Sequence, residues 1–210
     1  MVATVIPAPG FRVVGWSGWG NEVSLARWEF NPPSGTNTLT AHLEAYSPVP
    51  PARPPVILSE IQYHPASAAD SGDWFELHNP GTAPVDLTGW IVRDATDSNV
   101  SVLSGGVIPP GGYVVLCQDS LRFQRAFPAG PTPLGEFSFG LGNGGDTLRI
   151  HAADGALVLS LAYDDTAPWP VDADGGGATL ALKSVGAYSD QPTAWKTSSR
   201  LGGSPGAANP

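Results

Sequence analysis

The stretch Val56-Ile-Leu-Ser-Glu-Ile-Gln-Tyr-His-Pro65, followed by Asp73-Trp-Phe-Glu-Leu-His-Asn-Pro-Gly81, decides the fold of this 210-residue chain. Both segments are rich in β-branched and aromatic residues, and both end at turn-forming residues, so they predict two strands joined by a loop. Apolar and polar residues alternate in the second segment but not cleanly in the first. Pro80 fixes φ and Gly81 accepts positive φ, which predicts a turn directly after the second strand.

More strands are expected downstream. A short apolar strand precedes the Gly89-Trp90 step, where Trp90 is placed to fill the interior of a sheet. Regular spacing of apolar runs between Gly, Pro and Asn turns is typical of a β-sandwich. Nine strands are predicted, near residues 56–63, 73–78, 84–87, 89–94, 100–103, 113–117, 146–151, 156–163 and 178–183.

The order of these motifs resembles that of the lamin tail domain family, found in nuclear lamins and in secreted bacterial proteins. Downstream motifs agree with the resemblance, which covers residues 56–209: Ile108-Pro-Pro-Gly-Gly-Tyr113, Leu141-Gly-Asn-Gly-Gly-Asp146, and Gly202-Gly-Ser-Pro-Gly-Ala-Ala-Asn209, a C-terminal signature of bacterial members. The resemblance implies that residues 56–210 form an all-β, immunoglobulin-like sandwich.

Residues 1–47 are predicted to form a separate small β module. Its expected strands are Val2–Ile6, Phe11–Trp16, Ser24–Phe30 and Thr38–Tyr46. The run Pro7-Ala-Pro-Gly-Phe-Arg-Val-Val-Gly-Trp-Ser-Gly18 resembles the end of a Gly-Trp β-repeat of bacterial surface proteins. The chain is therefore expected to begin inside a module, with an export signal upstream. Residues 48–55 are rich in proline and are expected to be an extended linker.

Two non-strand features are expected in the larger domain. Residues 120–127 predict a short helix, with Asp119 or Ser120 as its N-cap and Pro128 as its stop. After Lys183 the chain is rich in Ser, Gly and Pro, which predicts a strap over the edge of a sheet, anchored by Trp195.

Composition narrows the class of partner. The formal net charge is −9, with 10 Lys and Arg residues that form no basic run, which argues against a nucleic-acid binder. No segment has the roughly 18 apolar residues of a membrane span. Acidity suits an extracellular protein or a cation-binding one. The single cysteine, Cys117, lies in an apolar run and is expected to be a buried, inert thiol.

Motifs for catalysis are missing from the sequence. The four histidines have no metal-ligand spacing, and there is no nucleophile elbow. Paired carboxylates for glycoside cleavage would require Glu60, Glu76 or Glu136 to face one cleft, whereas the resemblance makes Glu60 and Glu76 recurrent strand residues. The alternation of Glu76 with His78 is interpreted as a solvated strand face. No catalytic residue and no cofactor other than a metal ion is expected.

One candidate metal site stands out. Asp164, Asp165, Asp172 and Asp174 lie within eleven residues of loop. Loop carboxylates and carbonyls are the ligands that Ca²⁺ prefers, although this spacing is not that of an EF-hand. A solvated acidic loop is the alternative. Asp94 with Asp97 is a second, weaker acidic candidate.

The seven tryptophans allow a sugar-binding hypothesis. Trp74, Trp90 and Trp195 lie in apolar contexts and are expected in the core. By contrast, Trp19 and Trp169 lie beside turn residues, as Trp16 does, and are expected to be exposed, where they could stack on sugars.

The function expected from these features is that of a non-catalytic accessory domain of a larger secreted or cell-surface protein. Its partner would be a protein or a surface polymer. The alternatives are a carbohydrate-binding module, or the C-terminal part of an extracellular hydrolase or kinase whose catalytic domain lies upstream.

Overall fold

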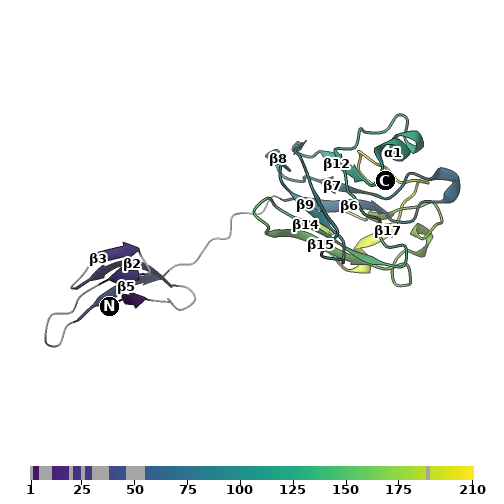
Figure 1. Cartoon of the computed structure of the whole chain (residues 1–210). Helices are drawn as coiled ribbons and strands as arrows, with labels where there is room; N and C mark the ends of the chain where they lie inside the picture. The colour runs from purple at the N-terminus through teal and green to yellow at the C-terminus, as the bar shows by residue number, and fades with distance from the viewer. Residues whose placement is uncertain are drawn as a thin grey trace. The chain divides into compact units, whose positions relative to one another are not determined.

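The chain divides into two compact units, Met1–Ala52 and Arg53–Pro210. The computed structural model describes residues 2–4, 11–18, 21–24, 27–29, 38–45, 55–187 and 190–210 (Figure 1). Of the predicted linker at 48–55, only Pro55 lies within the described residues. We therefore treat each unit by itself.

The first unit contains two small antiparallel sheets. One has the strand order β1-β4-β3, and the other pairs β2 with β5. The strands are β1 (Val2–Thr4), β2 (Phe11–Ser17), β3 (Asn21–Ser24), β4 (Arg27–Glu29) and β5 (Thr40–Ala45).

The predicted single strand Ser24–Phe30 is wrong. Ser24 ends β3 and Arg27 begins β4, and the two residues face each other in an antiparallel pair. The apolar pattern did not reveal the reversal of the chain. The first part of the predicted Gly-Trp repeat, Pro7–Gly10, lies outside the described residues.

The second unit is a two-layer β-sandwich (Figure 1). A six-stranded sheet has the order β13-β12-β7-β6-β16-β17, a four-stranded sheet has the order β10-β9-β14-β15, and β8 pairs with β11. The strands are β6 (Ile57–Gln62), β7 (Trp74–His78), β8 (Val85–Asp86), β9 (Ile91–Arg93), β10 (Val100–Val102), β11 (Val107–Ile108), β12 (Tyr113–Cys117), β13 (Gly135–Glu136), β14 (Asp146–His151), β15 (Leu157–Tyr163), β16 (Leu180–Leu182) and β17 (Trp195–Thr197).

All nine strands predicted for this unit are present, with slightly different ends. Strands β11, β13 and β17 were not predicted, and they have only two or three residues each. Strands this short carry too few residues for alternation to be recognised. Four 3-10 turns complete the unit: η1 (Ser67–Ala69), η2 (Val171–Ala173), η3 (Val185–Ala187) and η4 (Pro192–Ala194).

The hydrophobic core lies between the two sheets. Leu58 and Phe75 enter it from the six-stranded sheet, and Val92 and Ile150 enter it from the four-stranded sheet. All four are fully buried, and Trp90 and Trp195 join the same cluster. The predicted sandwich and the predicted core role of these tryptophans are confirmed.

A bulge in β6 explains why its apolar residues do not alternate. Leu58 pairs with Leu77 and Glu60 pairs with Glu76, so the strand carries one extra residue between these pairs. An extra residue reverses the face on which later side chains lie. Leu58 before the bulge and Ile61 after it therefore both point into the core.

Helix α1 (Ser120–Ala126) covers part of the outer face of the six-stranded sheet. The Asp119 carboxylate caps it by accepting hydrogen bonds from the backbone N–H groups of Leu121 and Arg122, both at 2.9 Å. Its Phe123 packs edge-on against Trp74, with ring centroids 5.8 Å apart. Phe123 and Trp74 belong to a second small core that includes Cys117, which is buried as predicted.

The C-terminal segment after β17 forms the predicted strap, but it covers a face of the sheet rather than its edge. Ser204 donates its backbone N–H to Glu60 of β6, and Gly206 donates its own to Glu76 of β7. The Asn209 side chain donates to the Ser59 carbonyl at 2.8 Å. The strap and α1 thus share the outer face of the six-stranded sheet.

Candidate functional site

Two glutamates meet on the face covered by the strap. Glu60 and Glu76 are paired in register on β6 and β7, and both are fully buried. The prediction that Glu76 and His78 lie on a solvated strand face is wrong, because His78 is also buried, stacked on Tyr113 with ring centroids 4.1 Å apart. Alternation of apolar and polar residues along one strand shows that its two faces differ in polarity. It does not show whether other parts of the chain bury both faces.

Each glutamate is held by hydrogen bonds. Glu60 accepts from the Thr179 hydroxyl and from the Ser204 backbone at 3.0 Å. Glu76 accepts from the Ser59 hydroxyl at 2.6 Å and from the Gly206 backbone at 2.5 Å. Two of these donors are backbone groups of the strap, so the carboxylates hold it against the sheet.

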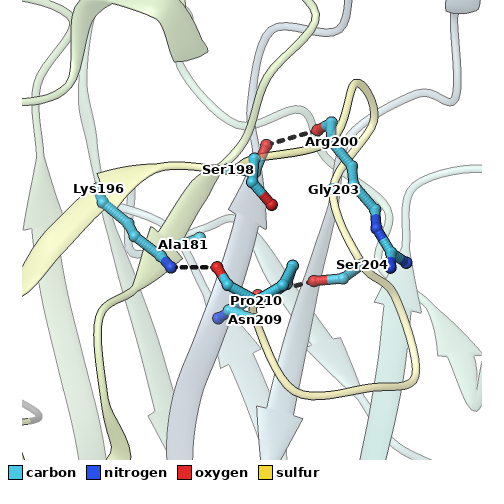
Figure 2. Close-up of a pocket in the computed structure, with 9 residues that line it drawn as sticks. Ala181, Lys196, Ser198, Arg200, Gly203, Ser204, Asn209 and Pro210 are labelled. Atoms are coloured by element: carbon cyan, nitrogen blue, oxygen red, sulfur yellow. Dashed lines mark hydrogen bonds between the residues drawn. The ribbon is translucent and has the colours of Figure 1, made fainter.

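Further contacts tie down the end of the strap (Figure 2). The Lys196 ammonium donates to the carbonyl of Pro210, and the Ser204 hydroxyl donates to the side chain of Asn209 at 2.9 Å. The recess that these residues line has no room for a water-sized occupant. It is a packing defect rather than a binding site.

Burial raises the pKa of both carboxyl groups. The pKa of Glu76 rises to about 8, because desolvation outweighs the hydrogen bonds that it accepts. Desolvation also raises the pKa of Glu60. Both carboxyl groups are fully buried beneath the strap, and Glu136 lies elsewhere, accepting a hydrogen bond from the Ser120 backbone. This geometry does not support glycoside cleavage.

The four aspartates of the calcium hypothesis make separate local contacts. Asp164 accepts hydrogen bonds from the backbone N–H and the hydroxyl of Thr166, and Asp174 pairs with His64 at 2.5 Å. Asp165 is half-buried, whereas Asp172 is exposed in the turn η2. In the part of the chain that the structure describes, no three His, Cys, Asp or Glu side chains gather as a metal site requires.

The second acidic candidate is divided in the same way. Asp94 is buried and accepts hydrogen bonds from the Thr96 backbone and the Asn99 side chain, both at 2.7 Å. Asp97 is exposed and forms an ion pair with Arg149 at 2.8 Å. Both aspartates therefore shape one loop rather than share a ligand.

A polar hollow of about 300 Å³ lies beside α1. Its lining includes the ion pair between Arg122 and Asp70, and the side chain of Asp73. Desolvation raises the pKa of Asp73 to about 6, and its carboxylate accepts a hydrogen bond from the Leu141 backbone at 2.8 Å. Each charged group of this hollow already has a partner, since His64, which also lines it, pairs with Asp174, and this leaves little for a ligand.

The tryptophan prediction is only partly right. Trp74, like Trp90 and Trp195, is buried as expected, but Trp169 is only 8% exposed and packs in the main core. The prediction that Trp169 is exposed is therefore wrong. Trp16 is half-buried, and Trp19 lies outside the described residues.

The outer face of the four-stranded sheet differs from the covered face. The contacts of the strap and of α1 described above are with strands of the six-stranded sheet. Because Val92 and Ile150 point into the core, the residues on either side of them in sequence point outward. We call this surface the open face, and it carries the residues of β9, β10, β14 and β15 that alternate with the core residues.

Strand register arranges the open face in two rows that cross the sheet. The first, the apolar row, runs Val102–Ile91–His151–Leu157. Where the register shifts after Ile150, β15 carries one extra residue, Val158, which turns Leu157 outward. Leu157 is 39% exposed and Val102 is 64% exposed. Val102 and Leu157 thus lie exposed at the two ends of this row.

The second, the cationic row, runs Val100–Arg93–Arg149–Ser160. Arg93 and Arg149 are paired across β9 and β14, and both guanidinium groups contact Asp97. Between the two rows lies an open hollow of about 370 Å³, lined by Ile91, Arg93, Asp97, Arg149, His151 and Gly155.

His151 contributes an unsatisfied group to this hollow. Its ring Nδ1 is buried and has no hydrogen-bond partner among the described residues. Burial, followed by repulsion from Arg93 and Arg149, lowers the pKa of His151 below its ordinary value, so the ring is neutral near pH 7. Buried polar atoms without a partner carry a cost in free energy, which a ligand in the hollow would remove only if the ring turned Nδ1 toward it.

The sequence analysis did not identify the open face. Arg93, Arg149 and His151 come from two strands about sixty residues apart, and no local motif connects them. Alternation within Arg149-Ile-His151 does place Arg149 and His151 on one face. Only the pairing of β14 with β9 adds Arg93 to them.

Comparison with known protein families agrees with the architecture. A family model described as Lamin Tail Domain matches residues 49–165. No curated protein matches the chain. Within the described residues, no helix is long and apolar enough to cross a membrane.

Proposed function

The chain belongs to the lamin tail domain family, and from that premise we propose that it is a non-catalytic interaction domain of a larger secreted or cell-surface protein. Its partner is a protein or a surface polymer. Domains of this family have an immunoglobulin-like fold and usually carry no catalysis. The secreted location rests on the likeness to bacterial members and on the acidic composition.

The observation that carries the proposal is the contrast between the two outer faces of the sandwich. One is covered by α1 and the strap, which bury Glu60 and Glu76. The other has a hollow of about 370 Å³ that brings Arg93, Arg149 and His151 together beside Ile91. A hollow that combines a few convergent polar groups with apolar side chains is the usual setting of a binding site.

The carbohydrate-binding alternative has less support in the structure. It required exposed tryptophans, and Trp169 is buried in the core. A catalytic role for the domain itself also has less support. Among the described residues, Glu60 and Glu76 are fully buried, and no three His, Cys, Asp or Glu side chains gather at one place.

A blocking experiment tests the proposal. Cys117 is fully buried, so an added surface cysteine can be labelled selectively with a bulky maleimide. Val102→Cys places the label on the open face, and Leu121→Cys, at a residue 66% exposed on α1, is the matched control. Both labelled chains and the unlabelled chain are used to select from a random displayed-peptide library and to bind a panel of cell-wall polymers.

We expect ligands that bind the unlabelled chain and the Leu121→Cys chain but not the labelled Val102→Cys chain. Ligands blocked equally at both positions would contradict the open face as the binding surface. A complete lack of ligands from both the library and the polymer panel would contradict the interaction function.

A further inference from the structure

We propose that the open face binds an acidic segment of a partner protein that carries apolar side chains beside its carboxylates. The inference rests on the proposed function and specifies its ligand. It starts from the adjacency of the apolar row and the cationic row, which strand register places one beside the other. A ligand that satisfies both rows must be amphipathic and negatively charged.

The arginines retain donors for such a ligand. A guanidinium has five N–H donors. Arg149 uses Nε–H for the Asp94 carbonyl and its Nη2 for Asp94 and Asp97. Arg93 uses its Nη1 for the Asp97 carbonyl at 2.6 Å. These contacts fix both side chains in place, and each guanidinium group keeps N–H donors that they do not use. Arginines held in this way are preorganised to bind a carboxylate.

His151 adds a polar ring between the two rows. The ring lines the same hollow as Arg93 and Arg149, and its Nδ1 is buried without a hydrogen-bond partner among the described residues. A carboxylate held by the two guanidinium groups would lie beside this ring, and rotation of the ring toward the hollow would let Nδ1–H donate to it. Negative charge at this point also offsets the repulsion that the arginines exert on a protonated ring.

The overall charge of the chain selects the class of ligand. A long polyanion, such as nucleic acid or a uronate polymer, would extend past the two arginines and meet a protein of net charge −9. A polyanion also offers no apolar groups to Val102 and Leu157, which remain exposed at the ends of the apolar row. A short acidic and apolar peptide segment meets both requirements.

Three labelled peptides of identical length and leucine positions test the inference. Their intervening residues are Glu in the first, Gln in the second and Lys in the third. Binding is measured by fluorescence anisotropy with the full chain, with Arg93→Gln, and with Arg125→Gln as the matched control, since Arg125 is an exposed arginine on α1. We expect the Glu peptide to bind roughly tenfold or more tightly than the Gln peptide, and the Lys peptide least of all.

Arg93→Gln should lower affinity for the Glu peptide by roughly tenfold, because an ionic hydrogen-bond partner is lost, and Arg125→Gln should leave it unchanged. Val102→Glu is a second variant that adds repulsion at an exposed position and leaves both arginines in place. In NMR spectra, the His151 ring resonance, assigned with His151→Gln, should move on addition of the Glu peptide.

Equal binding of the Glu and Gln peptides, or an Arg93→Gln chain that binds as well as the unsubstituted chain, would overturn the acidic-ligand inference. The proposed function would survive that result if the label at Val102→Cys still blocked ligands selected from the library. Polygalacturonate is tested in the same way. If it bound more tightly than the Glu peptide, and if Arg93→Gln abolished that binding, the peptide inference would be overturned in favour of a polymer ligand.

Discussion

At the level of single residues, Glu76 shows how burial changes the effect of pH on stability. Its pKa rises to about 8 in the folded chain, whereas an unfolded glutamate has a pKa of about 4.3. Between these values the folded state binds more protons than the unfolded state. Stability from this group therefore falls as pH rises through that window and is constant above it.

We predict that Glu76→Gln removes much of this pH dependence. The amide keeps the shape of the protonated acid and carries no charge that must be desolvated. The free energy of unfolding of the unsubstituted chain should fall relative to the variant by up to roughly 1.4 kcal/mol per pH unit between about pH 5 and pH 8. Urea unfolding at several pH values measures the difference.

Glu136→Gln serves as the control of opposite sign. Glu136 is exposed, and hydrogen bonds from Ser120 lower its pKa. Its contribution is present above the unfolded pKa and disappears as pH falls through the folded pKa, so this substitution should cost stability at neutral pH but not at low pH. If both variants followed the same pH trend, the assignment of the raised pKa to Glu76 would fail.

Two glycines with the same backbone conformation allow the cost of backbone strain to be measured separately from the cost of a steric clash. Gly203 in the strap has φ +82°, and Gly155 in the β14–β15 hairpin has φ +83°. A Cβ at Gly203 would meet the Glu60 carboxylate, whereas a Cβ at Gly155 would meet nothing within 4 Å. Gly155→Ala should cost roughly 1–2 kcal/mol. Gly203→Ala should cost clearly more, because the strap must move off the sheet.

Thermal unfolding measures both variants. Equal losses would show that the strap accommodates a methyl group and that its contact with Glu60 is loose. The comparison also controls for the effect of alanine on the unfolded chain, which is the same at both positions.

The calcium hypothesis can be decided at this scale as well. Aspartates in a loop favour a Ca²⁺ site, but Asp164 and Asp174 are occupied by Thr166 and His64. From these contacts we expect the melting temperature to be the same in millimolar Ca²⁺ and in chelator. A stabilisation of several degrees by Ca²⁺ would show that the loop rearranges around the ion, and Asp172→Asn should then abolish it.

At the level of elements, α1 shows how a cap and a core contact combine in a helix of only seven residues. A helix this short is not stable alone. Asp119 satisfies two N–H groups at its start, and Phe123 anchors it against Trp74. The cap was one of two candidates in the sequence, and the structure selects Asp119.

Asp119→Ala should lower the free energy of unfolding by about 1 kcal/mol, through loss of the two capping bonds. Gln124→Ala, at an exposed position of the same helix, should change stability little, since alanine is the better helix former. Denaturant unfolding of both variants is the measurement. A larger loss from Gln124→Ala would contradict the assigned role of the cap.

At the scale of the whole molecule, the second unit has a hydrophobic core of its own. In the described part of the chain, both core clusters consist of residues from Val56 to Trp195. Hydrophobic stabilisation is roughly proportional to the apolar area removed from water, so this unit contains what it needs to fold. The unit boundary falls between Ala52 and Arg53.

We predict that residues 53–210 expressed alone fold and melt within about 2 °C of the same transition in the full chain, since roughly 1 kcal/mol shifts the midpoint of a domain of this size by 2–4 °C. Calorimetry of both proteins measures this. A drop of many degrees in the shorter protein would show that the first unit contributes to its stability.

The sequence by itself determined the class of fold, the nine longer strands, the capped helix and the tryptophans at Trp74, Trp90 and Trp195. These features are local, since turn residues and apolar alternation act within a few positions. Even the bulge in β6 was visible in the sequence, because apolar and polar residues do not alternate between Leu58 and Ile61.

Only the tertiary structure decided which side chains meet. The pairing of Glu60 with Glu76 under the strap, the burial of Trp169, and the alignment of Arg93 with Arg149 all depend on strand register and on segments far apart in sequence. Register is set by how both sheets pack on a common core, because a slip of one residue would turn every side chain to the opposite face. No short stretch of sequence contains that information.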